Sequence, residues 1–322
     1  MLSSNSIKKI ARQTITTEAR AVTKLLKFID NEFARAISLI YKSKGRLIIT
    51  GIGKSAIIGN KIVATLNSTG TPAIFMHAAD AIHGDLGIIQ EDDIVLCISK
   101  SGNSPEIKLL VPLIKNLGNS IIGMVSNNSS FLAQKSDITI ITPVDKEACP
   151  NNLAPTSSTT VQLVTGDAIA VCLLECRGFT EKDYARYHPG GTIGKKLYMR
   201  VSDFFLENKI PRVYITDTIP HVIFEISSKR LGATAVLNDK GELAGIITDG
   251  DLRRMLEKNN GLNSLRAGDI MTRSPRTIDI DAMAIEAFEI MKQNNITQLL
   301  IMNKNIYSGI IHLHDILKEG VV

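Results

Sequence analysis

Tryptophan is absent from this 322-residue sequence, and aromatic residues make up only 5% of it. No apolar run approaches the roughly 20 residues that a membrane-spanning helix needs, because Asp167 interrupts the longest candidate, residues 161–174. The N-terminus has no apolar stretch typical of a signal peptide, and the four cysteines lack the spacing of a disulfide framework. We therefore expect a reduced, cytoplasmic protein that does not associate with a membrane.

The net charge of +5 is concentrated near the N-terminus. Residues 1–46 carry ten Lys and Arg against three Asp and Glu, whereas the rest of the chain carries 27 against 29. A basic segment could contact nucleic acid, but apolar residues recur beside these charges at helical spacing, from Ile10 to Ile40. No zinc finger, RNA-binding signature or aromatic platform accompanies the charges. We expect amphipathic helices with a solvated face and no nucleic-acid partner.

Residues 93–117 have the pattern of a buried strand followed by a turn and a helix. Residues 94–98 are uniformly apolar, which is typical of a strand buried on both faces. Ser104, Pro105 and Glu106 suit the N-cap, the first position and the first turn of a helix.

The turn in this segment is rich in hydroxyl groups, with Ser99, Ser101 and Ser104 beside Gly102. Hydroxyls, free N–H groups and the positive end of a helix dipole together form a phosphate site. Glycine allows the backbone to approach a neighbour closely. We predict that the three serines hold a phosphate; an ordinary turn between a strand and a helix is the alternative.

Strands alternate with helices over the first 200 residues. The expected strands span residues 46–50, 72–76, 94–98, 120–126 and 138–142, and a helix over 156–177 closes the unit. This order predicts an α/β fold with a doubly wound, five-stranded parallel sheet and flanking helices. Ligands bind such sheets at the carboxyl ends of the strands, so the loops at these ends are candidate site loops.

Residues 51–56 contain Lys54 in a glycine-rich turn at the end of the first expected strand. A P-loop is excluded because it needs a glycine at position 48, which is Ile. A dinucleotide fingerprint fits the glycines, but Met76 and His77 stand where its acidic residue is expected. We therefore favour a catalytic or anion-binding role for Lys54, with an NAD-dependent enzyme as the weaker alternative.

Beyond residue 200 the sequence contains an internal repeat. Residues 201–205 resemble 267–271, and residues 245–252 resemble 309–316. Each copy has the pattern strand, helix, strand, strand, helix. The predicted domains are therefore residues 1–200, followed by two repeats over 201–262 and 263–322.

These motifs resemble those of a known family over nearly the whole chain. The serine-rich turn is similar to the signature loop of sugar isomerase (SIS) domains, and the repeats resemble a tandem pair of cystathionine-β-synthase (CBS) domains. Together with residues 83–87, 153–160 and 187–191, in this order, they resemble the D-arabinose-5-phosphate isomerases. The resemblance implies an aldose–ketose isomerase that converts D-ribulose 5-phosphate to D-arabinose 5-phosphate through an enediolate, for synthesis of the lipopolysaccharide sugar Kdo. Such chemistry needs no redox cofactor.

The resemblance also implies which residues form the site. The catalytic residues of the family match Lys54, Glu106, Glu147 and His188. The implied substrate-binding residues are His83, Ser55, Gly70, Thr71, Ser99, Ser101, Ser104, Thr156, Ser157 and Ser158. A zinc-contacting histidine matches His77, where the metal is inhibitory rather than required. The family further implies a homotetramer, in which His83 is the candidate for a residue contributed by a neighbour.

Moving a proton beside a carbonyl needs a base, an acid and positive charge near the enediolate. Glu106 falls in the first turn of an expected helix, whose dipole weakens a carboxylate as a base. No comparable group is predicted beside Glu147. We therefore expect Glu147 to move the proton and Glu106 to support it, and the reverse assignment stays open.

The CBS resemblance implies a ligand between the two repeats. An Asp in a Thr-x-x-Asp turn accepts hydrogen bonds from both ribose hydroxyls of a nucleotide. Thr248 and Asp251 keep this turn, whereas His312 replaces the threonine before Asp315. We expect one competent nucleotide or nucleotide-sugar site on Asp251 and a weaker one on Asp315. A role of the pair in assembly alone is the alternative.

Two other functions fit the same motifs. One is an SIS–CBS isomerase of another sugar-phosphate pathway. The other is a sugar-phosphate-sensing regulator, which would need a DNA-binding module. Residues 1–46 show no clear helix-turn-helix pattern, so we favour the enzyme.

Overall fold

The computed structural model describes residues 2–207, 210–257 and 264–322. The chain divides into two compact units, Met1–Tyr184 and Ala185–Val322, and each is described by itself. The division places α9 (Thr192–Tyr198) in the second unit. There the Lys195 ammonium donates a 2.7 Å hydrogen bond to the backbone oxygen of Glu319. The domain boundary predicted at residue 200 stays a prediction.

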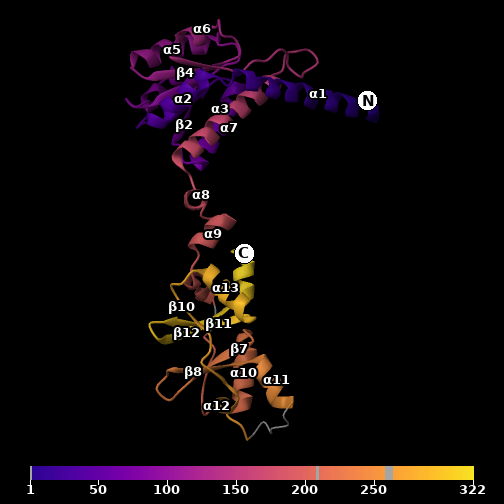
Figure 1. Ribbon diagram of the computed structural model, residues 1–322, viewed down its shortest axis with the longest axis vertical. Helices are drawn as coiled ribbons and strands as arrows, with labels where there is room; N and C mark the ends of the chain where they lie inside the picture. The colour runs from indigo at the N-terminus through magenta and orange to yellow at the C-terminus, as the bar shows by residue number, and fades with distance from the viewer. Residues whose placement is uncertain (1, 208–209, 258–263) are drawn as a thin grey trace. The chain divides into compact units, whose positions relative to one another are not determined.

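The first unit contains the predicted five-stranded parallel sheet, in the order β2-β1-β3-β4-β5 (Figure 1). Its strands are β1 (Leu47–Gly51), β2 (Ala73–His77), β3 (Ile94–Ile98), β4 (Ser120–Val125) and β5 (Ile138–Ile141). All four pairings are parallel, so the carboxyl ends of the strands share one edge. The sheet expected from the alternating pattern is confirmed.

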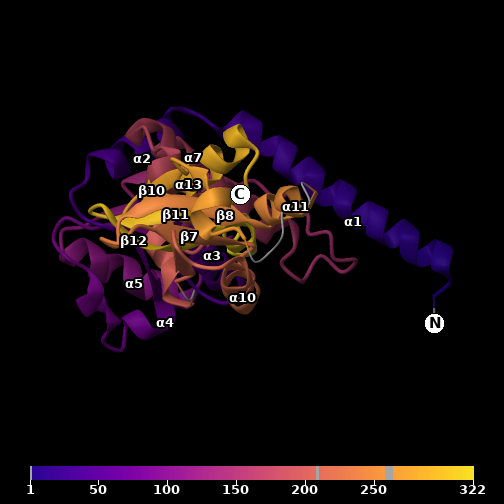
Figure 2. The same cartoon turned by 90° about the horizontal axis from the view of Figure 1, so that it is seen from below.

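Helices cover both faces of this sheet (Figures 1 and 2). One face packs on α2 (Asn31–Lys42), α3 (Lys54–Ser68) and α7 (Ser157–Arg177). The other face packs on α4 (Ala78–Ala81), α5 (Pro105–Asn116) and α6 (Phe131–Lys135). Successive strand residues serve opposite faces: Leu47 and Ile49 join the first cluster, and Ile48 joins the second. This two-sided burial explains why the strands are apolar throughout.

Helix α1 (Ser4–Leu25) precedes the sheet and packs with α7. Figures 1 and 2 show its N-terminal part extending beyond the rest of the first unit. Within the described residues, α7 is long and apolar enough to cross a membrane by length and composition alone. In this unit it contributes Ile169, Ala170 and Leu173 to the buried core.

The second unit contains the two predicted repeats, each with the order strand, helix, strand, strand, helix. The first comprises β6 (Arg212–Tyr214), α10 (Ile219–Lys229), β7 (Ala233–Leu237), β8 (Leu243–Thr248) and α11 (Asp249–Glu257). The second comprises β10 (Thr277–Asp279), α13 (Ala284–Asn294), β11 (Gln298–Asn303), β12 (Ile306–His312) and α14 (Leu313–Lys318). A shared apolar cluster joins β7 to β11 and β12. The Tyr307 hydroxyl also donates a 2.8 Å hydrogen bond across the repeats to the Pro211 carbonyl.

Candidate active site

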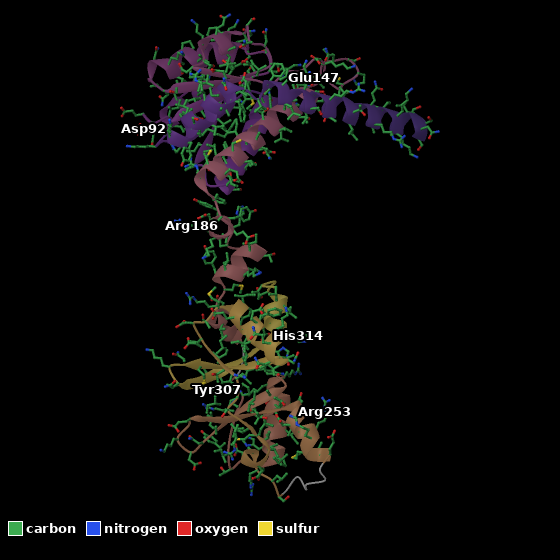
Figure 3. The ribbon with its side chains drawn as sticks, viewed as in Figure 1. Asp92, Glu147, Arg186, Arg253, Tyr307 and His314 are labelled. Atoms are coloured by element: carbon green, nitrogen blue, oxygen red, sulfur yellow. The ribbon has the colours of Figure 1, made fainter. Side chains whose placement is uncertain are left out.

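Three loops lie at the carboxyl edge of the five-stranded sheet, and a side-chain contact between Lys100 and Glu147 joins two of them. They are residues 51–55 after β1, residues 99–104 after β3, and residues 142–156 after β5. Figure 3 shows Glu147 at this edge and Asp92, which precedes β3, at the opposite one. The parallel topology therefore gathers most of the predicted site residues in one place.

The serine-rich loop holds its own hydroxyls in position. Ser99 Oγ accepts a 3.1 Å hydrogen bond from the Gly102 N–H, and Ser101 Oγ accepts one of 3.2 Å from Asn103. Gly102 has φ +65°, and a Cβ there would lie 2.3 Å from Ser130 Oγ. The glycine is therefore required by the close approach of Ser130 as well as by the turn.

Four buried hydroxyl groups near this edge have no hydrogen-bond partner among the described residues: Thr50, Ser104, Thr142 and Ser157. Ser104 occupies the N-cap position of α5, as predicted, but its side chain makes no capping hydrogen bond. Buried polar atoms are normally paired. These hydroxyls are therefore the polar groups of this edge whose hydrogen bonds are not satisfied within the described residues. Sequence reasoning missed Thr50 and Thr142, because a threonine at a strand end carries no distinguishing signal.

Glu147 is the most strongly bound carboxylate of the site and is only 2% exposed. Its Oε1 lies 2.6 Å from the ammonium of Lys100. Its Oε2 accepts hydrogen bonds of 2.8 and 3.1 Å from the backbone N–H groups of Thr156 and Ser158, at the start of α7. The Thr156 hydroxyl lies 3.3 Å from the same oxygen.

These contacts change the acidity of Glu147. Burial alone would raise the pKa, but Lys100, Ser158 and Thr156 outweigh burial and lower the pKa of Glu147 to about 2. The expectation that nothing near Glu147 weakens it as a base is therefore wrong. The lowered pKa of Glu147 is caused by a lysine distant in sequence and by a helix N-terminus. The linear sequence pattern could not show that these groups lie beside Glu147. Glu106 lies half-buried in the first turn of α5, as predicted.

The loop after β1 joins the site through α7. Ser55 Oγ lies 3.2 Å from the side-chain oxygen of Gln162, which is buried. Lys54 is the first residue of α3 and is exposed, and Gly53 before it has φ +59°. Lys54 therefore stands at the predicted edge with its side chain accessible to a ligand.

His77 and His83 flank the short helix α4 after β2, at the same edge. His83 is exposed. His77 is half-buried, and its Nδ1 lies 3.7 Å from Asp80 Oδ2. The described residues contain no group of three or more His, Cys, Asp or Glu that could hold a metal ion.

Gly70 and Thr71 are not brought to this edge. They precede β2 and lie at the amino edge of the sheet, where the Arg177 Nε donates a 3.3 Å hydrogen bond to Thr71 Oγ1. Gly70 has φ +86°, and a Cβ there would lie 2.7 Å from the ring of Phe179. Packing against Phe179 and the hydrogen bond from Arg177 therefore account for the presence of Gly70 and Thr71 at these positions. His188 follows α8 (Glu181–Tyr187) in the second unit.

The Thr248–Asp251 turn of the first repeat is formed as expected. Asp251 is 8% exposed, and its Oδ2 accepts hydrogen bonds from the N–H and hydroxyl of Thr248 at 2.8 and 2.7 Å. Its Oδ1 accepts a 2.6 Å hydrogen bond from Arg254. Burial opposes these contacts, yet together they lower the pKa of Asp251.

The second repeat caps α14 differently. His312 Nδ1 accepts a 3.1 Å hydrogen bond from the N–H of His314, and the two rings stack with centroids 5.0 Å apart. Asp315 Oδ2 accepts a 3.1 Å hydrogen bond from the His312 N–H. Burial and the neighbouring His314 lower the pKa of His312, against the opposing effect of Asp315. The two repeats therefore present different surfaces to a ligand.

Comparison with known proteins places both parts of the chain in families. Residues 39–172 match the SIS domain family, and residues 201–258 and 267–321 match the CBS domain family. A solved structure of an Escherichia coli CFT073 protein, determined with a bound ligand, has a TM-score of 0.57 and 38% identity. The matched region covers 58% of this chain and 100% of the solved chain.

Relatives are similar over nearly their full length. The arabinose 5-phosphate isomerase KdsD of Pseudomonas aeruginosa is 44% identical, over 97% of this chain and 96% of its own. KdsD of Francisella tularensis is 46% identical over 96% and 95%. The arabinose 5-phosphate isomerase KpsF of Escherichia coli CFT073 is 44% identical over 94% and 93%. This chain, an SIS domain followed by two CBS domains, belongs to the arabinose 5-phosphate isomerase family.

Proposed function

We infer that this protein is an aldose–ketose isomerase that interconverts D-ribulose 5-phosphate and D-arabinose 5-phosphate. The observation that carries the inference is similarity at 44% identity or more, over nearly the full length, to proteins named arabinose 5-phosphate isomerase. The reaction supplies the five-carbon precursor of Kdo, the lipopolysaccharide sugar. Hydroxyl and N–H groups that can bind a phosphate lie near the same sheet edge as two glutamates, and this arrangement fits the chemistry.

The substrate phosphate binds between the serine-rich loop and the start of α7. Ser104 and Ser157 support this placement, because their buried hydroxyls have no partner among the described residues. The N-terminus of a long helix adds N–H donors, which hold Glu147 in the free protein, and favourable dipole charge for an anion. The other proposed phosphate-binding residues are Ser99, Ser101, Thr156 and Ser158.

Proton transfer between C1 and C2 uses the carboxylates and the cations of the edge. Glu147 is the proposed base, and Glu106 supports it. Lys54 serves the substrate oxygens, where negative charge develops in the enediolate. A catalytic role of His188, which lies in the second unit, is carried over from the family resemblance alone. Because Glu147 is held as an ion pair in the free protein, its action as a base requires that these contacts loosen when substrate binds.

The reaction as proposed uses no cofactor, because the proton returns to the neighbouring carbon without net oxidation. Zinc is proposed to inhibit through His77. Its half-exposed imidazole and Asp80 could supply two ligands, so further ligands would come from substrate or another copy of the chain.

We propose that the enzyme works in the cytoplasm as a homotetramer. Exposed apolar residues along the projecting helix α1, including Ile7, Ile10 and Ile15, support association with other copies. His83 is exposed at the site edge and is the proposed contribution to a neighbouring active site. The CBS pair is proposed to bind a nucleotide or nucleotide-sugar at Asp251, and less well at Asp315.

The function is tested by incubating the purified full-length protein with D-ribulose 5-phosphate and identifying the aldose by chromatography against standards. D-Arabinose 5-phosphate is the expected product. D-Ribose 5-phosphate or no aldose would reject the assignment. Lys54→Ala protein with an unchanged thermal midpoint is the control for contaminating isomerase, and it should form little product.

A further inference from the structure

Lys100 lies between Ser99 and Ser101 in the serine-rich loop and has no role in the reaction as proposed. Its ammonium makes a 2.6 Å ion pair with Glu147, and its side chain is 44% exposed while that of Glu147 is fully buried. Breaking such a pair leaves the buried carboxylate without its counter-ion. The contact therefore fixes where the Glu147 carboxylate lies.

The other oxygen of this carboxylate occupies the start of α7, where a phosphate would be held. It accepts from the N–H groups of Thr156 and Ser158 at 2.8 and 3.1 Å. Helix N-termini bind carboxylates and phosphates by the same donors. The fully buried Ser157 hydroxyl, between these two residues, has no partner among the described residues, so this helix start holds a further donor that no acceptor satisfies.

We propose that Glu147 occupies the phosphate-binding amides of α7 in the substrate-free protein, and that Lys100 is the positioning residue that holds it there. This inference rests on the proposed function. A sugar phosphate carries more negative charge than one carboxylate, so it displaces Glu147 from the amides. The displaced carboxylate loses the donors that weaken it, and becomes a stronger base only when substrate is present.

The first test measures binding of inorganic phosphate to the full-length protein by calorimetry. Glu147→Gln removes the internal anion with little change of shape, and should lower the Kd by about tenfold. Asp145→Asn is the matched control, because Asp145 lies in the same loop but pairs with the Lys24 ammonium instead. It should change the Kd by less than about twofold. Equal tightening by both changes, or no tightening by Glu147→Gln, would overturn the proposal.

The second test follows the amide resonances of Thr156 and Ser158 in selectively labelled protein. Without phosphate, these resonances should differ between wild type and Glu147→Gln. At saturating phosphate they should coincide, because phosphate then occupies the amides in both proteins. A difference that persists at saturation would mean that Glu147 stays in place, and would reject displacement.

The role of Lys100 is tested by the carboxyl resonance of Glu147, which is identified by its loss in Glu147→Gln. Lys100→Met should raise its titration midpoint by at least one pH unit, and Lys100→Arg should leave it near the wild-type value. An unshifted midpoint in Lys100→Met would remove the positioning role.

The two proposals fail in different ways. If wild type makes no arabinose 5-phosphate but phosphate binding tightens in Glu147→Gln, the substrate assignment fails and the displacement stands. If the isomerase assay succeeds and phosphate binding does not tighten, the displacement fails and the function stands.

Discussion

Arg46 and Asp93 form an ion pair with three hydrogen bonds at the amino edge of the sheet, opposite the candidate active site. Arg46 Nη2 lies 2.7 Å from Asp93 Oδ2, and the Arg46 Nε and N–H donate to Oδ1 at 3.2 and 2.7 Å. The two residues immediately precede β1 and β3, which are neighbours in the sheet. The pair therefore joins two central strands at the edge that carries no proposed catalytic residue.

We predict that Asp93→Asn lowers the free energy of unfolding by about 3 kcal/mol at pH 7, because it removes the buried carboxylate of the pair and leaves the half-buried Arg46 without its counter-ion. Burial raises the pKa of Asp93, but hydrogen bonds from Arg46 and Gln90 lower it below its usual value. The stabilisation is then present above the ordinary aspartate pKa and is lost as the pH falls through the folded value. Urea unfolding should show the difference between the proteins shrinking below about pH 4.

The control for this prediction is Glu32→Gln, which removes one partner of the more exposed pair with Arg35. Exposed pairs contribute little to stability, so this change should have a much smaller effect. Equal effects of the two substitutions would contradict a special role of the Arg46–Asp93 pair.

Ser101→Ala should raise KM for ribulose 5-phosphate by about tenfold with little change in kcat, if the phosphate is bound equally in the ground and transition states. Steady-state kinetics measures both constants. Ser120→Ala makes the same chemical change at the start of β4, on the amino edge, and should leave KM unaltered. Unchanged kinetics in Ser101→Ala would remove this serine from the phosphate site.

Glu147→Gln should abolish exchange of the substrate C2 proton with solvent deuterium, because an amide cannot accept that proton as a base. Glu106→Gln should slow exchange without abolishing it. NMR of the substrate in deuterated buffer follows both. Exchange that persists in Glu147→Gln and disappears in Glu106→Gln would reverse the two roles.

His83→Ala and Lys54→Ala proteins should each be inactive and should regain part of the activity when mixed, if a neighbouring copy supplies His83. Some shared sites in mixed oligomers would then contain both native residues. The isomerase assay after mixing and subunit exchange measures this. A fully active monomer in sedimentation would exclude a shared site.

Asp251→Ala should abolish calorimetric binding of the CBS ligand, with adenine nucleotides, cytidine nucleotides and CMP-Kdo as the probes. Asp315→Ala should weaken binding less, since the His312 cap already gives the second repeat a different surface. The thermal midpoint of each variant must be compared, because Asp251 also caps α11 through Thr248. No binding to wild type at millimolar concentration would leave assembly as the role of the pair.

The sequence alone determined the five strands of the first sheet, their order along the chain and the repeat that follows them. The apolar run at residues 94–98 could be identified as a buried strand because a strand covered on both faces has no polar side. The repeat beyond residue 200 predicted two copies of one arrangement, since the same pattern of apolar and polar residues recurs. The position of the serine-rich loop followed as well, because the end of a parallel strand fixes the edge of the sheet.

Tertiary structure decided how the individual side chains are used. Lys100 and Glu147 are 47 positions apart, and only the packing of two loops brings their charges to 2.6 Å. Ser104 has the sequence position of a helix cap, yet its hydroxyl is buried without making the capping bond. Local sequence restricts backbone conformation over a few residues, whereas burial, charge pairing and acidity depend on which distant groups the completed fold places beside them.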